Sequence, residues 1–349
     1  MKAEFVSTLV HHDTARATIA RTQAKLHSAE IEVSTGRHAD IGEVLGFGVS
    51  RLLDTRQLAA ELDAIGSTNA VVAARLTMTQ SALSGMVELG QELFESITAL
   101  RQGGGDRSAL VGQAEAALGT LTSLLSTTSN GAYIFSGVNT AVAPVADYLA
   151  DPPSTARLAV QAAFNTAFGV NPDDPAVSAI NGGDMAAYLS GDFSALFTEP
   201  GWSTTFSSAA HDLMQDRIAP NETITSSLSA NADGIRSLMQ ALIAAIDSGT
   251  RELGAEAFDR LAESILKTAG QAVHDLVQSQ SVLGIAQERL AKANARMNVE
   301  RSLFEERIGA AEGVDSYAAA VRLMSLSTQL EASYSVTSRM QKLSLLNYL

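Results

Sequence analysis

The side chains that could act as acids, bases or metal ligands form no recognisable catalytic cluster in this sequence. Two histidines four residues apart on a helix could share a metal ion. The histidines lack this spacing and stand at His11, His12, His27, His38, His211 and His274. Acid–base catalysis would need convergent polar groups, and the candidates are Asp184, Asp192, His211 and Asp212. An enzyme with its site in residues 141–220 is therefore one hypothesis, although we expect no catalysis, no cofactor and no metal.

Two short motifs that could bind a ligand are incomplete. Gly46-Phe47-Gly48 lacks the third glycine of a dinucleotide-binding turn, and no convincing strand precedes it. Asp173 and Asp174 lie between prolines without the twelve-residue pattern of a calcium loop, so we interpret them as an acidic turn. The chain has no cysteine, which excludes disulfides, zinc sites built on thiolates and cysteine catalysis.

Charge and hydropathy exclude further classes of function. The chain has 349 residues, with 24 Lys and Arg against 38 Asp and Glu, and its formal net charge is −14. No basic stripe is present, whereas a nucleic-acid partner requires clustered cations. The sequence has no run of about 18 apolar residues that could cross a membrane. Its first residues also lack the uninterrupted apolar segment of a secretory signal. We therefore expect no nucleic-acid partner and no membrane insertion.

The prolines divide the chain into a centre and two arms. All seven lie between Pro144 and Pro220, which leaves 143 residues before and 129 residues after this window without proline. Because proline costs about 3 kcal/mol inside a helix, the arms are predicted to be helical and the centre irregular or β-structured. Ten of the 18 aromatic residues lie between Tyr133 and Phe206, including Trp202, so a compact core is expected there.

Both arms have the seven-residue periodicity of long packed helices. In the first arm the repeat starts at residue 58, and Gly103 and the two glycines after it are predicted to end a helix of roughly 65 Å. Two positions of each repeat are predicted to be buried. The first is occupied by Leu58, Ile65, Val72, Thr79, Met86, Leu93 and Leu100, and the second by Leu62, Asn69, Leu76, Leu83, Gly90 and Ile97. The second arm repeats the pattern at Ala269, Leu276, Leu283, Leu290, Met297 and Phe304. We expect these two helices to pack against each other.

The two chain ends carry narrower stripes of the same kind. Small residues such as Ala15 and Ser333 lie within them, so a pair of these helices alone would bury little area against its ordering entropy. Either both ends are core helices of one closed bundle, or they order fully only on assembly with neighbouring subunits. The residues predicted to form this assembly interface are Ile19, Leu26, Val33, Leu323, Leu326, Leu330, Tyr334, Met340 and Leu343.

Two segments between the arms and the centre are predicted to contain strands. Asn130-Gly131 is a turn signal, and the strand-forming sequence YIF follows it closely. Residues 202–229 alternate Thr, Ile and Ser around Pro220-Asn221 and are predicted to return the chain to the helices. These patterns predict a mainly α fold, with long antiparallel helical coiled-coil or bundle arms from both termini and a smaller β-containing central insert domain.

Four segments of the arms carry a family resemblance. They are the turn Ser34-Thr35-Gly36-Arg37, NGAYIFSGVNT at residues 130–140, PNETITSSLSANADGIR at residues 220–236, and the terminal LSLLNYL. These sequences resemble the flagellin superfamily, and within it the hook-filament junction proteins, also called flagellar hook-associated protein 3. Residues 38–43, HADIGE, depart from the polar N-x-x-D-D-P/A stretch that many members carry there. The contact chemistry of that loop is therefore not carried over.

The resemblance implies a division of the chain into three parts. Residues 1–41 with 312–349 would form a terminal coiled-coil domain that lines an inner tube, and residues 42–140 with 206–311 a long helical domain with β-hairpins. Residues 141–205 would be a variable outer domain. The chain would then be a structural subunit of the extracellular bacterial flagellum, exported by the flagellar type III apparatus without a cleaved signal. Its implied partners are copies of itself, neighbouring hook-associated protein and flagellin subunits, and a cytoplasmic export chaperone.

We therefore hypothesise that the chain forms the junction between hook and filament by coiled-coil self-assembly. The nearest alternative is flagellin itself, the filament subunit, and the sequence NGAYIFSGVNT favours the junction. A coiled-coil adhesin or sensor with a small globular head is a more remote alternative. The sensor would require a membrane span, which the sequence does not show.

Overall fold

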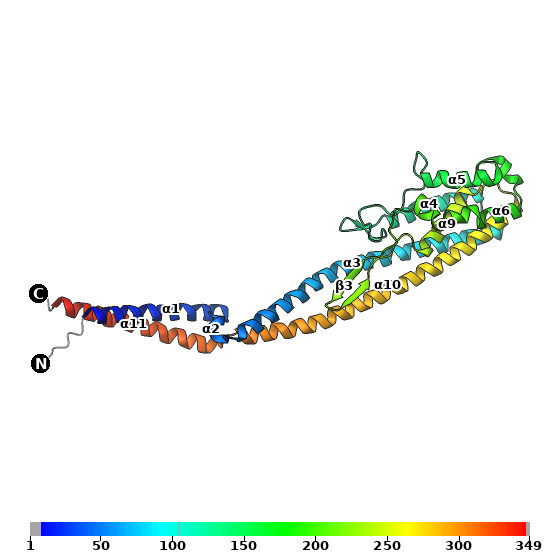
Figure 1. The fold of residues 1–349 in the computed structure, drawn as a ribbon. Helices are drawn as coiled ribbons and strands as arrows, with labels where there is room; N and C mark the ends of the chain where they lie inside the picture. The colour runs from blue at the N-terminus through cyan, green and yellow to red at the C-terminus, as the bar shows by residue number, and fades with distance from the viewer. Residues whose placement is uncertain (1–7, 104, 347–349) are drawn as a thin grey trace. The chain divides into compact units, whose positions relative to one another are not determined.

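The computed structural model describes residues 8–103 and 105–346, with side chains for residues 13–103 and 105–339. It contains long α-helices and two small antiparallel sheets (Figure 1). This architecture confirms the predicted mainly α fold class, because long helices come from both ends of the chain and the strands belong to its central region. Among the residues described, no helix combines the length and the hydropathy needed to cross a membrane.

The chain forms two compact units. Unit 1 lies within residues 1–63 and 298–349, and unit 2 comprises residues 64–297. The helices α3 (Gly48–Arg101) and α10 (Ala255–Glu312) each contribute to both units. The three-part division implied by the family resemblance stays a prediction.

Unit 1 pairs two helices from opposite ends of the chain. α1 (Thr8–Thr35) and α11 (Ser316–Leu346) run antiparallel and lie side by side (Figure 1). The short helix α2 (Ile41–Leu45) follows α1, and the Asp40 carboxylate accepts a hydrogen bond from the Glu43 amide in its first turn. This cap satisfies a backbone donor that the start of a helix leaves unpaired. The chain therefore passes from α1 to α3 through a short, capped helix.

The seven-residue stripes of both long helices are buried as predicted. On α3 every predicted position from Leu62 to Ile97 is buried, and α10 buries its predicted positions from Ala269 to Phe304. Two predicted positions are not buried: Leu100 is half-buried, and Leu58 is 48% exposed while its neighbour Ala59 is half-buried. A helix with 3.6 residues per turn drifts away from a strict seven-residue repeat, so the buried seam has shifted by one residue at Leu58.

α3 is longer than the repeat predicts. It begins at Gly48, and its 54 residues correspond to about 81 Å at the α-helical rise. It ends at Arg101, just before Gly103 with φ +84°, as the glycine run predicts. Within unit 2, α3 and α10 pack closely, because a Cβ added at Gly90 would lie 2.7 Å from a methyl group of Val273. The predicted packing of the two arms is thus confirmed.

The predicted hairpin at Asn130-Gly131 is confirmed. β1 (Thr128–Ser129) and β2 (Ala132–Tyr133) pair antiparallel around these two residues, whose φ angles are +52° and +80°. A two-residue hairpin turn of this type needs positive φ at both central positions, and Asn-Gly adopts it at low cost.

The return segment is only partly β-structured. β3 (Gln215–Ala219) and β4 (Glu222–Thr225) pair antiparallel across Pro220-Asn221, as predicted. The start of the segment instead forms the helix α8 (Gly201–Thr205). There the buried indole of Trp202 packs on neighbouring aromatic rings, and this tertiary contact overrides the local strand preference of Thr and Ser.

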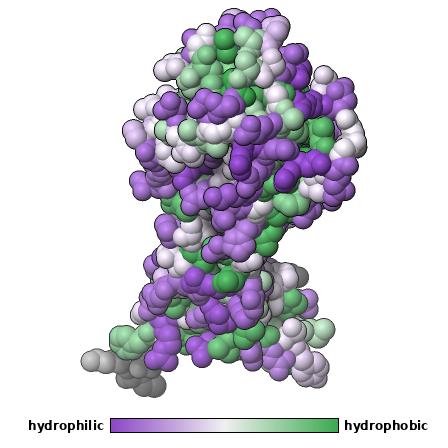
Figure 2. Space-filling model, turned by 90° about the vertical axis from the view of Figure 1, so that its right-hand side faces the viewer, coloured by the Kyte–Doolittle hydropathy of each residue, from purple (hydrophilic) through white to green (hydrophobic). Residues whose placement is uncertain are grey.

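The other elements of unit 2 contribute to one hydrophobic core that contains a cluster of aromatic rings. They are α4 (Arg107–Leu125), α5 (Thr155–Phe168), the 3-10 turn η1 (Pro175–Ala179), α6 (Gly182–Ser190), α7 (Asp192–Ala195) and α9 (Asp233–Asp247). The rings in continuous contact belong to Tyr148, Phe164, Phe168, Tyr188, Phe193, Phe197, Trp202 and Phe206. This cluster confirms the core expected from the aromatic content. On the surface, hydrophilic side chains cover much of the face seen in Figure 2.

Candidate assembly interface

The paired terminal helices carry all the predicted interface residues. Those with half-buried side chains are Ile19, Leu26, Leu323, Leu326 and Leu330. Val33 and Tyr334 are 38% and 47% exposed, and the Tyr334 hydroxyl accepts a hydrogen bond of 2.7 Å from Gln23 Nε2. Met340 and Leu343 belong to α11, but their side chains lie outside the part that the structure describes. The half-buried residues therefore contribute to pairing within one chain, and the assembly role of the whole set stays a prediction.

Unit 1 buries few of its large apolar side chains and leaves half of those described exposed. Among its described residues, only Leu52, Leu62 and Phe304 are large apolar side chains that are buried. The exposed ones are Ile31, Val33, Val44, Phe47, Leu53, Leu58, Val299, Leu303, Tyr317, Val321, Met324, Tyr334 and Val336. Apolar exposure concentrated in one region is typical of a surface that binds another protein. Unit 1 alone is therefore an incomplete core.

The turn Ser34-Thr35-Gly36-Arg37 ends α1 and is hydrogen-bonded to the residues that precede α11. Gly36 has φ +68°, the left-handed conformation that commonly ends a helix. Its carbonyl accepts a hydrogen bond of 3.0 Å from the Val314 amide, and Arg37 forms an isolated β-bridge with Gly313. The glycine and the arginine of the family-like turn thus have a structural explanation in this chain.

A buried carboxylate, Glu312, lies at the same junction. Its side chain is 1% exposed, with Oε2 at 3.0 Å from Arg37 Nη1 and Oε1 at 2.8 Å from Arg56 Nε. The His38 amide also donates to the Glu312 carbonyl at 2.8 Å. A buried carboxylate is tolerated only when charges and hydrogen bonds replace its lost water. We call Glu312, Arg37 and Arg56 the clasp.

A second carboxylate, Glu32, extends the network across the two terminal helices. It is 7% exposed, and its oxygens lie 3.1 Å from Arg322 Nη1 and 3.7 Å from His38 Nδ1. Sequence reasoning missed both glutamates, because it searched for apolar periodicity and because Arg56 and Glu312 are 256 residues apart. The available signal was the conspicuous turn that contains Arg37.

The acid–base candidates of the centre do not converge. Asp184 and Asp192 lie in the first turns of two different helices, α6 and α7. His211 Nε2 lies 3.4 Å from a Glu199 carboxylate oxygen, and Asp212 contributes its backbone carbonyl to a hydrogen bond of 3.0 Å. Within the described part of the chain, no three His, Asp or Glu side chains are grouped so that they could hold a metal ion. This geometry gives no support to the enzyme hypothesis.

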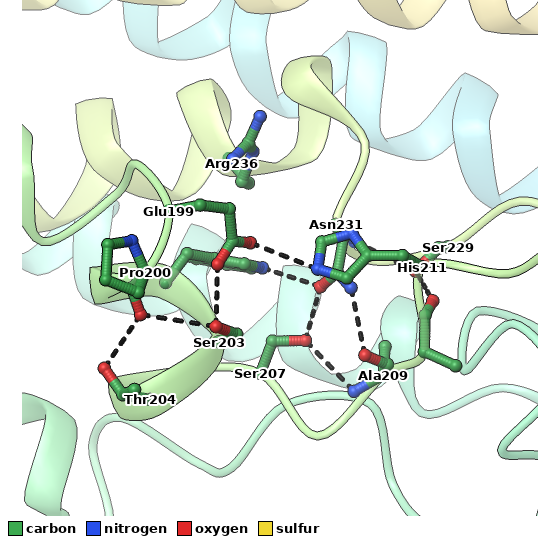
Figure 3. Close-up of polar contacts among 12 residues, drawn as sticks. Glu199, Pro200, Ser203, Thr204, Ser207, Ala209, His211, Ser229, Asn231 and Arg236 are labelled. Atoms are coloured by element: carbon green, nitrogen blue, oxygen red, sulfur yellow. Dashed lines mark hydrogen bonds and ion pairs between the residues drawn. The ribbon is translucent and has the colours of Figure 1, made fainter.

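The polar contacts beside His211 serve packing instead. Asn231 is 8% exposed, and its Oδ1 accepts hydrogen bonds from Trp202 Nε1 at 2.8 Å and from Ser207 Oγ at 2.6 Å. Its Nδ2 donates to the Ala209 carbonyl at 2.9 Å (Figure 3). These hydrogen bonds connect the segment that follows α8 to the segment that precedes α9.

A third buried carboxylate, Asp247, anchors the aromatic core. Its Oδ2 accepts a hydrogen bond of 2.7 Å from the Tyr148 hydroxyl and lies 3.2 Å from Arg157 Nε. Burial raises the pKa of Tyr148, and the charge of Asp247 raises it further. The phenol therefore stays protonated and keeps its donor role.

These features define a class of protein: a mainly helical chain whose two ends pair with each other and expose apolar faces. Comparison with known families agrees with this class. The family models for the bacterial flagellin N-terminal and C-terminal helical regions match residues 6–140 and 266–349. The chain belongs to the flagellin family, and it is a structural component of the bacterial flagellum.

One solved structure supports the fold. A protein from Vibrio parahaemolyticus, provisionally described as a flagellar hook-associated protein, matches with a TM-score of 0.51 and 10% sequence identity. The match covers 76% of this chain and 97% of that chain. At this identity the likeness concerns the fold alone. No curated protein sequence matches the chain.

Proposed function

We propose that the chain is the subunit that joins the flagellar hook to the filament by coiled-coil self-assembly. The observation that carries the assembly role is the exposed apolar surface of unit 1, which the described part of the chain leaves uncovered. The similarity of NGAYIFSGVNT to the junction proteins supports an assembly between hook and filament. The similarity in fold to a protein described as hook-associated agrees with this location. The role is structural and involves no catalysis and no cofactor.

The proposal includes partners and a location. The subunit is exported by the flagellar type III apparatus and acts outside the cell. Its partners are copies of itself, neighbouring hook-associated protein and flagellin subunits, and a cytoplasmic chaperone before export. The predicted residues of α1 and α11 contribute to these contacts, together with the outward-facing Val321 and Met324, which are 50% and 71% exposed.

Deletion of the gene in the source bacterium tests the junction role. We expect cells that retain hooks, lack filaments and release unassembled flagellin into the medium. The second candidate is flagellin, which the description of the two matching family models favours. In that case the chain would be the dominant protein by mass in sheared flagella, whereas a junction subunit would be a trace band.

Substitutions on the outer face of α11 test the assembly role. Val321→Asp combined with Met324→Asp places two charges on side chains that are exposed in the single chain, so folding should be preserved and incorporation into flagella lost. Leu326 and Leu330 are less suitable, because they are half-buried and their replacement would disturb the pairing of α1 with α11. Ser325→Asp, at an exposed polar position of the same helix, is the control. Normal filaments in the double variant would contradict the proposal.

A further inference from the structure

Phe47 is a fully exposed aromatic side chain held between two glycines. It lies between α2 and α3, after Gly46 with φ +49° and before Gly48, the first residue of α3. It is the most exposed of the large apolar side chains that the structure describes. Burying a phenylalanine contributes about 1.5–3 kcal/mol relative to leaving it in water. An aromatic ring presented in this way is therefore suited to insertion into another surface.

The same unit contains an open groove between α1 and α11. Its volume is about 450 Å³, and it is lined by Ala15, Thr18, Ile19, Ala332, Ser333 and Val336, among other residues. None of its lining side chains is charged, and most of them are small. The groove is large enough for one aromatic ring, which would gain apolar contacts without displacing an ion pair.

The chain cannot fill this groove with its own Phe47. The contacts of His38 and Arg56 with Glu312 hold the chain on both sides of Phe47 at the junction of the helices. Ile19 lies sixteen residues before the end of α1 at Thr35, which corresponds to about 24 Å along the helix. Phe47 and the groove are therefore far apart within one copy, and only a second copy can bring them together.

We propose that Phe47 of one copy of the chain inserts into the α1–α11 groove of a neighbouring copy. The inference rests on the proposed assembly role and names one contact within it. Because the ring and the groove are different surfaces, the contact is heterologous, and repetition of such a contact builds a ring or a helical array rather than a closed dimer. Each copy offers one Phe47 and one groove.

The area of the contact limits where it can form. One aromatic side chain buries about 150–250 Å², whereas a stable protein interface needs about 1,000 Å² or more in total. This contact alone therefore cannot hold two free copies together. It is expected in the assembled flagellum, where other contacts position the neighbours, and not in the isolated chain.

Cysteine cross-linking tests the contact directly, because the chain has no cysteine of its own. A full-length variant with Phe47→Cys and Ala332→Cys replaces the natural protein, and flagella are isolated with their hooks and oxidised. Because this variant also lacks the ring, less of it should be incorporated. We expect disulfide-linked multiples among the copies that are incorporated and none in the purified monomer. The control combines Ala332→Cys with Val299→Cys, at a 73% exposed apolar position of the same unit, and should give no multiples.

The outcomes separate this contact from the assembly role itself. If the natural chain is absent from flagella, the proposed function fails and this inference fails with it. If the chain is present but the cysteine introduced in the Phe47→Cys variant stays reactive to maleimide, or links to another protein, the contact is refuted and the function stands. Phe47→Ser gives a second measure: the monomer should melt at the same temperature as the natural chain, and incorporation should fall at least fivefold. Unchanged incorporation would also refute the contact.

Discussion

Replacement of Glu312 by glutamine is expected to loosen the junction of α1 with α11 and to leave unit 2 intact. Glutamine keeps the shape of the side chain but removes the charge that faces Arg37 and Arg56. Breaking a fully buried ion pair costs about 3–5 kcal/mol. Here the two arginine side chains are 64% and 43% exposed and can regain water, so the expected loss is about 1–3 kcal/mol.

Two reporters separate the effect on unit 1 from any effect on unit 2. The amides of His38 and Val314 donate across the junction, and their hydrogen exchange should become about 5- to 150-fold faster for a loss of 1–3 kcal/mol. Trp202 is fully buried in unit 2 and is the only tryptophan. Its fluorescence should therefore report an unchanged midpoint of urea denaturation.

Glu306→Gln is the matched control for this experiment. Glu306 is an exposed glutamate on the same helix, so its replacement removes the same charge without touching the clasp. Exchange at His38 and Val314 should stay at the natural rate in this variant. Equal exchange rates in the Glu312 variant and the natural chain would refute the argument that the buried carboxylate holds the junction, and so would an equal acceleration in both variants.

Further predictions concern unit 2 and can be checked by urea denaturation. Gly137→Ala should lower the free energy of unfolding by about 3 kcal/mol, because Gly137 has φ +62° and a Cβ there would lie 2.6 Å from the Ala210 carbonyl oxygen. Gly119→Ala, at a helical glycine with open space around it, should instead stabilise by about 0.5–1 kcal/mol; a loss in both variants would point to a cause other than positive φ. Tyr148→Phe should cost about 1–3 kcal/mol, because Asp247 loses a hydrogen-bond donor. Since folding raises the pKa of Tyr148, its contribution is complete below the ordinary tyrosine pKa of about 10 and declines at higher pH. The stability of the natural chain should therefore fall above that pH, and the Tyr148→Phe variant should fall less steeply.

The helical arms were predictable because their signals are local. The repeat from Leu62 to Ile97 and the absence of proline predict a long helix with one apolar face, which is buried once a partner helix packs against it. The turn at Asn130-Gly131 was predictable for a related reason, since its positive φ angles depend on the two residues themselves. The prediction of burial was wrong at Leu58, because a strict seven-residue repeat does not account for the 3.6 residues per helical turn.

The candidate interface was predictable only in part. The narrow stripes of α1 and α11 indicated helices that need partners, but not which leucines would be used within the chain. Leu326 is half-buried in the pair, whereas Met324, which the periodicity did not select, is the more exposed side chain. Exposure depends on the rotation of each helix relative to its partner, and a single stripe does not determine that rotation.

By itself the sequence determined the class of this protein: long helical arms, an aromatic core at the centre and family motifs in both arms. Periodicity, proline placement and turn residues act over a few neighbours, so they can be read without the fold. Only the tertiary structure decided that Glu312 is buried between Arg37 and Arg56, that Trp202 lies in a helix, and that Phe47 is left exposed. These outcomes depend on contacts between segments that are remote in the chain, whose energies are set by burial and distance rather than by local preference.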